Sequence, residues 1–184
     1  MLRRLAVFLL LLAGVARADE NVSVCYGYGC LVQVGIEYSD ARLDRIGRQL
    51  NAAVDPKNER KILSDVIGQL YAWAGEQSDV KNDRGGNYAD GTTPGKMDCI
   101  DHSTSTTRLL QMLEKRHYLR WHQVLEPEVR NFAFVFPAHY AAVIEEKSAE
   151  PARRFVVDSW FVDNGQPAVI LPLDEWKKGA GPDV

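Results

Sequence analysis

Hydrophobic residues recur at helical spacing in the first half of the chain and predict two helices. The first covers residues 40–50, where the apolar positions lie on one face. The second covers residues 57–76 and begins after Asp55-Pro56, a typical helix start. The apolar positions on these two faces are Leu43, Ile46, Leu50, Ile62, Leu63, Val66, Ile67, Leu70 and Ala74.

Residues 78–97 follow the second helix and are rich in glycine and turn-forming residues. Four glycines and a proline in this segment predict a long loop. Long loops inside compact domains are often functional. A third helix is predicted over residues 99–115, so the loop leads directly to Cys99 at the start of that helix.

Three later segments, residues 131–146, 153–162 and 167–173, are rich in aromatic and β-branched residues and predict strands. The turn-forming segment 147–152 joins the first two strands, and Asn164-Gly165 is a hairpin signal before the third. An antiparallel meander packed on the third helix is the simplest arrangement. We therefore expect an α+β domain.

The first 18 residues have the pattern of a signal peptide. Arg3 and Arg4 precede an apolar run, and Ala16-Arg17-Ala18 matches a cleavage site. Removing 18 residues from 184 leaves 166, which fits a single domain over residues 19–184. No later stretch approaches the roughly 20 apolar residues of a membrane helix, so we expect a periplasmic or secreted protein without a membrane span.

The net charge of the chain limits the classes of binding partner that we expect. The first 18 residues carry three arginines and no acid, so removing them takes the formal net charge from −3 to −6. Basic residues are not clustered anywhere in the chain. Nucleic acid and anionic membranes are therefore not expected as partners.

The chain has three cysteines, an odd number for an exported protein. Cys25 and Cys30 bracket the segment "YGYG", whose glycines allow the tight turn that a disulfide would need. Cys99 is then left over as a free thiol, which is either a reactive nucleophile or a buried packing residue. Asp98 and Asp101 flank it, and their charges oppose ionisation of the thiol.

A thiol nucleophile needs a base, and the base needs a third group that orients it. His139 lies in a predicted strand, and Asp158 is a charge in the next, otherwise apolar, strand. If residues 147–150 form a four-residue loop, opposed residues keep a constant sum of 297, and His139 faces Asp158 directly. Strand register therefore predicts a Cys99, His139 and Asp158 triad.

These residues resemble a known family. "MDCIDHSTSTTRLL", "HYAAVIEE" and "VVDSWF" are similar to the core of the transglutaminase-like superfamily, and "DCID" resembles the nucleophile region of bacterial transglutaminase-like cysteine proteinases. The helix ending "LYAWAGEQ" resembles the one that precedes the cysteine loop in such domains. The resemblance covers about residues 57–165.

The resemblance implies a papain-like fold in which helices pack on an antiparallel sheet and Cys99, His139 and Asp158 are catalytic. Acyl transfer would run through a thioester on Cys99, and water or an amine would complete the reaction. The backbone N–H of Cys99 is one expected oxyanion donor. A second donor would come from Gln77, Asn87 or Tyr88, among which the sequence does not choose.

Two metal hypotheses remain beside the expectation of no cofactor. Some proteinases that the chain resembles bind calcium through acids beside the cysteine. Asp98 matches that pattern, but Ile100 stands where such relatives can carry an acid, and Asp98 and Asp101 also suit a helix start. A zinc site from Cys99, His102 and His139 would lack the usual paired-ligand spacing.

We therefore expect an exported cysteine peptidase, amidase or transglutaminase-like acyltransferase that acts on a protein or peptide. The alternative is an inactive binding or accessory module with the same fold, because fold does not fix function. The sequence does not decide between hydrolysis and cross-linking. Reactivity of Cys99 would discriminate the two classes.

Overall fold

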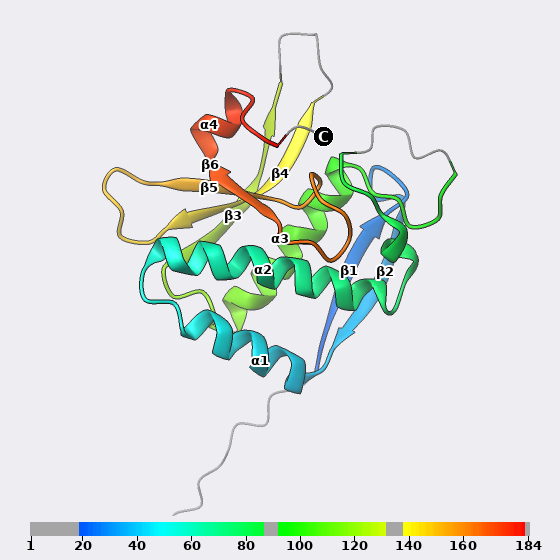
Figure 1. The fold of residues 1–184 in the computed structure, drawn as a ribbon, viewed down its shortest axis with the longest axis horizontal. Coiled ribbons are helices and arrows are strands. Elements are labelled where there is room, and N and C mark those ends of the chain that lie inside the picture. Colours follow the sequence, from blue (N-terminus) through cyan, green and yellow to red (C-terminus); the bar gives the residue numbers. More distant parts are fainter. Residues whose placement is uncertain (1–18, 87–91, 132–137, 183–184) are drawn as a thin grey trace, which may run out of the picture.

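The computed structural model describes residues 19–86, 92–131 and 138–182, and this part of the chain folds into four α-helices and two antiparallel sheets (Figure 1). The predicted α+β class is confirmed. In chain order the elements are β1 (Glu20–Tyr26), β2 (Val32–Tyr38), α1 (Asp40–Asn51), α2 (Pro56–Gly75), the 3₁₀ turn η1 (Asp79–Asn82), α3 (Cys99–Lys115), β3 (His122–Arg130), β4 (His139–Glu146), β5 (Arg154–Asp158), β6 (Val169–Pro172) and α4 (Leu173–Lys177).

The three predicted helices are confirmed as α1, α2 and α3. Side chains cap their first turns: Ser39 accepts the N–H of Arg42 ahead of α1, and Asp55 accepts that of Asn58 ahead of α2. Pro56 is the first residue of α2, where its missing N–H costs nothing. No helix in the described ranges is both long and apolar enough to cross a membrane.

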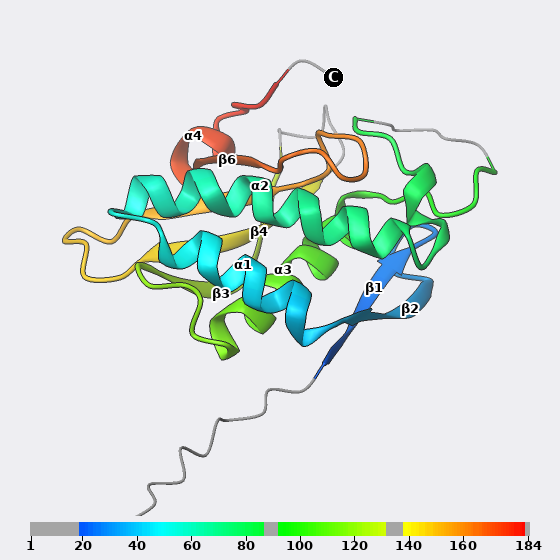
Figure 2. The same cartoon turned by 60° about the horizontal axis from the view of Figure 1, so that its bottom comes forward.

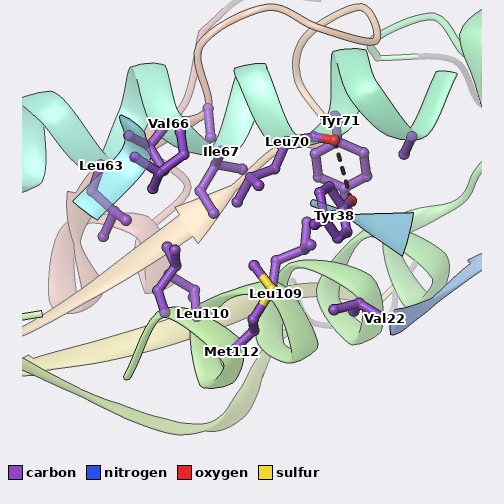
Figure 3. Packing of buried hydrophobic residues seen from close by; sticks show 14 of the residues in the cluster. Val22, Tyr38, Leu63, Val66, Ile67, Leu70, Tyr71, Leu109, Leu110 and Met112 are labelled. Carbon is purple, nitrogen blue, oxygen red and sulfur yellow. Dashed lines mark hydrogen bonds between the residues drawn. The ribbon is translucent and has the colours of Figure 1, made fainter. Parts of the chain in front are cut away.

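The main core lies between α2 and α3. Leu63, Ile67 and Leu70 of α2 point toward Leu109 and Leu110 of α3 (Figure 3). All five of these side chains are fully buried. Burying a side chain of this size contributes about 1.5–3 kcal/mol, so this contact holds the helix that begins at Cys99 in place.

A four-stranded antiparallel sheet, in the order β3-β4-β5-β6, covers this core. Residues of β4 alternate between its two faces: Ala142 and Ile144 join the main core, whereas Ala141 and Val143 join a smaller cluster around Trp176 of α4. The sheet therefore has α2 and α3 on one face and α4 on the other. The predicted meander packed on the Cys99 helix is confirmed.

A hairpin of β1 and β2 precedes α1, in a segment where no strand was predicted. Val22 and Val24 alternate inward on β1, and Ile36 and Tyr38 do the same on β2. This hairpin lies beside α3 at the opposite end of the molecule from α4 (Figures 1 and 2). The Tyr38 hydroxyl donates to the carbonyl of Leu70, which ties the hairpin to α2 (Figure 3).

The edge strand β3 was also not predicted. Its register against β4 shifts between Leu125 and Glu128, a β-bulge that contains Pro127. The buried Glu59 of α2 fixes the start of β3, because its carboxylate accepts the N–H groups of Arg120, Trp121 and His122. A carboxylate with no solvent exposure is tolerated there because these donors replace water.

The predicted long loop, residues 78–97, contains η1 and then returns to α3. Gly95 has a φ of 84°, and a Cβ there would lie 1.8 Å from the carbonyl oxygen of Asp79. Only glycine fits this close approach. Further along, the buried Asp83 accepts the N–H of Met97, two residues before the cysteine.

Candidate active site

Cys99, His139 and Asp158 each lie at one end of a helix or strand, and these three ends meet. Cys99 is the first residue of α3, His139 the first of β4 and Asp158 the last of β5. His139 Nε2 lies 2.7 Å from Asp158 Oδ2. The Cys99 thiol donates to the carbonyl of Ala138, the residue before His139, at 3.6 Å, and it lies close enough to the imidazole to raise the pKa of His139. Cys99 is half-buried, and Asp158 is only 1% exposed. The triad that the sequence predicted is brought together.

The predicted strand register was wrong, although the same pair meets. Val143 faces Val156, and the N–H of Glu146 bonds to the carbonyl of Arg153, so the β4–β5 loop is six residues long rather than four. In this register, the position on β4 that lies opposite Asp158 is two residues after His139. A shift of two residues preserves the face on which each side chain lies, so the two remain diagonal neighbours within hydrogen-bond reach.

Asp158 accepts hydrogen bonds from two tryptophans as well as from His139. The indole N–H of Trp176 donates to Oδ2 at 3.0 Å, the same oxygen that His139 contacts. The backbone N–H of Trp160 donates to Oδ1 at 3.2 Å. The sequence pattern missed Trp176, although its position in the short helix α4 leaves it fully buried.

Aromatic rings surround the imidazole of His139. The ring centroid of Trp160, two residues after Asp158, lies 4.8 Å from that of His139. Phe161 and Trp176 lie at 5.5 and 5.6 Å. Such a wall limits water around the His139–Asp158 pair and strengthens their electrostatic attraction.

The charge balance of the site favours a protonated His139. Burial lowers the pKa of the imidazole, but the hydrogen bonds and charges of Asp158 and Cys99 outweigh this and raise its pKa to about 9. Since Nε2 is taken by Asp158, Nδ1 is the nitrogen left for the thiol. An imidazolium at neutral pH is the partner that a cysteine thiolate needs.

The two acids beside Cys99 form a capping box at the start of α3. Asp98 accepts the N–H groups of Ile100 and Asp101, and Asp101 accepts that of Asp98 in return. Their predicted roles as N-cap and first-turn acid are confirmed. Burial raises the pKa of Asp101 to about 6, because the nearby charge of Asp98 adds to desolvation and backbone donors offset them only partly.

A disulfide-closed turn, residues 25–30, covers these two acids. The predicted bond between Cys25 and Cys30 is present. The N–H groups of Tyr28 and Cys30 donate to Asp101 at 2.8 and 2.7 Å, and that of Gly29 donates to Asp98 at 2.9 Å. These donors compensate the carboxylate charges that oppose ionisation of the neighbouring thiol.

The expected oxyanion donors have different outcomes. Asp98 takes the N–H groups of Ile100 and Asp101, and within the described residues no hydrogen bond occupies that of Cys99. The amide nitrogen of Gln77 donates to the carbonyls of Glu37 and Trp73, so its hydrogens point to β2 and α2 instead. Asn87 and Tyr88 lie outside the described residues.

The zinc hypothesis does not match the geometry, because both ring nitrogens of His102 are engaged by Asp83 and Ser159. Among the described residues, Cys25, Cys30 and Asp101 form the group with metal-ligating atoms close together, and its two sulfurs are joined in the disulfide. Asp98, which the calcium hypothesis would use, already accepts the backbone N–H groups of Gly29, Ile100 and Asp101.

Two hollows in the described surface lie elsewhere. They have volumes of about 740 and 810 Å³, share Phe155 and Pro172, and are lined by none of the triad residues.

Comparison of the chain with protein-family models, characterised proteins and solved structures finds no match. The function must therefore be inferred from the site itself.

Proposed function

We propose that the protein is a cysteine-dependent acyl-transfer enzyme, a transglutaminase-like peptidase or amidase. The observation that carries this proposal is a half-exposed thiol at a helix start that bonds to the residue before a histidine, whose Nε2 contacts a buried carboxylate. Cys99 is the nucleophile, His139 the general base and acid, and Asp158 the residue that orients His139.

The reaction divides into two displacements at one carbonyl carbon. The thiolate of Cys99 attacks the carbon, and the negative charge that develops on the oxygen is stabilised by the N–H of Cys99. His139 gives its proton to the leaving amine, which departs and leaves a thioester. Water or a second amine then attacks the thioester while His139 takes the proton back, and the thiolate leaves.

The substrate is a protein or peptide, and the location is periplasmic or secreted. A disulfide next to the nucleophile supports an oxidising compartment, because disulfides rarely persist in the cytosol. The acidic mature chain gives no support for nucleic acid as a substrate.

Acylation by p-nitrophenyl acetate tests the proposal without knowledge of the substrate. We expect a burst of nitrophenolate and an acetyl group on Cys99 by mass spectrometry. Cys99→Ala should remove both, and His139→Ala should slow acylation on the order of 100-fold. His117→Asn is the matched control, because His117 is exposed and asparagine tolerates its positive φ of 59°.

Two results would contradict an enzyme. One is acylation of Cys99 at the same rate in the wild type and in His139→Ala. The other is loss of the folded state in Cys99→Ala, which would mark Cys99 as a packing residue. Either result favours the binding or accessory module.

A further inference from the structure

A second chain of polar side chains lies buried beside the triad. His102 Nε2 is 3.0 Å from Asp83 Oδ2, and His102 Nδ1 is 2.9 Å from Ser159 Oγ. Ser159 Oγ is also 2.9 Å from Thr106 Oγ1, which is 3.0 Å from Tyr71 Oη. These five residues, from α2, α3 and two loops, are all buried.

The hydrogens in this network can follow one direction. Nε2 of His102 faces a carboxylate, so it carries the proton and donates to Asp83. Nδ1 then accepts from the hydroxyl of Ser159, which accepts from Thr106. The Tyr71 hydroxyl shares its hydrogen between Thr106 Oγ1 at 3.0 Å and the carbonyl of His102 at 3.3 Å. Every polar side-chain atom on this route has a partner, as a rigid buried network requires.

The order Asp83, His102, Ser159 is that of a serine hydrolase triad, but the burial excludes this use. Ser159 and His102 are each 4% exposed and Asp83 is 1% exposed. The cavity beside them has a volume of about 10 Å³, enough for about one water molecule. Ser159 therefore cannot act as a nucleophile on a substrate.

The network instead joins the chain segments that carry the triad. Asp83 holds the N–H of Met97, two residues before Cys99, while His102 lies one helical turn after Cys99 on α3. Ser159 directly follows Asp158. One hydrogen-bonded chain thus links the segment before the nucleophile, the nucleophile helix and the strand end that orients the base.

We propose that His102 and Ser159, held by Asp83, are positioning residues that set the separation between Cys99 and the His139–Asp158 pair. This inference rests on the proposed function. A shift of about 1 Å between reacting groups can cost about 100-fold in rate. The His102–Ser159 bond joins α3 to the segment after β5. When this bond is lost, the two segments can shift relative to each other, although the three triad side chains themselves are unchanged.

Alkylation of Cys99 by iodoacetamide, measured from pH 5 to 9 and normalised to the folded fraction by circular dichroism, tests the inference. Ser159→Ala and Asp83→Ala should alkylate about tenfold more slowly at pH 6, with a profile nearer that of an ordinary thiol. Ser64→Ala is the matched control, because it removes a hydroxyl bond to Ala168 that joins α2 to the segment before β6.

Asp83→Asn should restore most of the rate. An asparagine oxygen still accepts the N–H of Met97, while its amide donates to His102 and the whole network reverses direction with every partner kept. A purely structural role predicts no such difference between the two Asp83 variants in the alkylation profile. Where Ser159→Ala does not fold, Thr106→Val removes the hydroxyl that supports Ser159, with a loss of about two- to threefold expected.

The outcomes separate the two proposals. A wild type that alkylates rapidly at pH 6, together with variants that change only their unfolding temperature, would overturn the positioning role and leave the proposed function intact. A wild type with the profile of an ordinary thiol would overturn the proposed function and, with it, this inference.

Discussion

At the scale of single residues, Asp158 does more than hold His139. Its Oδ2 accepts both His139 and the indole of Trp176, while its Oδ1 accepts the N–H of Trp160. Three donors satisfy the hydrogen-bonding capacity of a carboxylate that is buried away from water. The same donors compete with the imidazolium for that charge, so they also limit how far Asp158 raises the pKa of His139.

Trp176→Phe isolates the indole N–H, because the phenyl ring keeps most of the packing against His139. We expect the alkaline limit of acyl transfer, set by the His139 pKa of about 9, to move upward, since Asp158 then interacts with His139 alone. The unfolding free energy should fall by about 2 kcal/mol. Trp121→Phe, on a half-buried tryptophan, is the control. An unchanged pH profile would show that Trp176 only fills space.

Asp158→Asn should lower the pKa of His139 from about 9 toward its ordinary value of 6.5, because the principal charge that favours the imidazolium is removed. The raised pKa stabilises the fold fully below pH 6.5, and this contribution is lost as pH rises through 9. The variant should lack that dependence. Nuclear magnetic resonance titration of the imidazole checks both statements, with Asp163→Asn as the control, because Asp163 pairs with Arg84 on the surface. A titration midpoint still near 9 would contradict the assigned role.

At the scale of elements, a capping box and a disulfide-closed turn meet at the start of α3. Residues 28–30 present three backbone N–H groups to Asp98 and Asp101, and the N–H of Gly27 bonds to the carbonyl of Lys96. The hairpin that carries this turn is therefore part of the surroundings of Cys99, although it is distant in sequence.

Replacing both cysteines of the turn tests this connection. Cys25→Ala with Cys30→Ala should lower the unfolding free energy by about 2 kcal/mol, the entropy expected of so short a loop. It should also slow alkylation of Cys99 at pH 8 in the folded protein, where Asp101 is ionised, because a mobile turn compensates the carboxylate charges less well. Leu31→Ser changes an exposed neighbour and is the control. Equal alkylation rates would confine the disulfide to a stabilising role.

Sequence periodicity predicted the helices well because each has an apolar face and a capping residue. The strands were harder to predict. The alternation of Val22 and Val24 with polar residues is typical of a strand, but no element was predicted over residues 20–38. Strand β3 contains Pro127 and a bulge, which hide the alternation, and the predicted tight turn at Asn164-Gly165 lies within a ten-residue connection, 159–168.

The candidate site was predicted in part for a similar reason. The residue types Cys99, His139 and Asp158 stand out because charges and thiols are rare at such positions. Trp176 and the network of His102 and Ser159 have no local signature, since their importance comes from contacts between distant segments. The register prediction reached the correct pair through a loop that was two residues too short, because an even shift preserves the strand face.

At the scale of the whole molecule, the helices and the sheet are joined by buried polar groups as well as by the core. Glu59 of α2 accepts three backbone N–H groups at the start of β3 and also His122 Nδ1 at 2.7 Å. This anchor involves none of the triad residues. Stability and catalysis are therefore expected to be separable in this fold.

Glu59→Gln tests that separation. The glutamine amide keeps one acceptor oxygen, but its NH₂ group faces the backbone N–H groups at the start of β3, which are donors themselves. The unfolding free energy should therefore fall by about 3 kcal/mol. The alkylation rate of Cys99 in the folded fraction should stay unchanged. Glu126→Gln, on an exposed residue of β3, is the control for both measurements. A large fall in alkylation rate would show that the anchor also positions the triad.

The proposed ion pair between Cys99 and His139 determines the pH at which Cys99 reacts, so the pH profile of Cys99 alkylation is the decisive measurement. Iodoacetamide should modify Cys99 rapidly at pH 6 in the wild type and on the order of 100-fold more slowly in His139→Ala, because an ordinary thiol is scarcely ionised there. Identical profiles in the two proteins, both half-maximal near pH 8.5, would contradict the pairing.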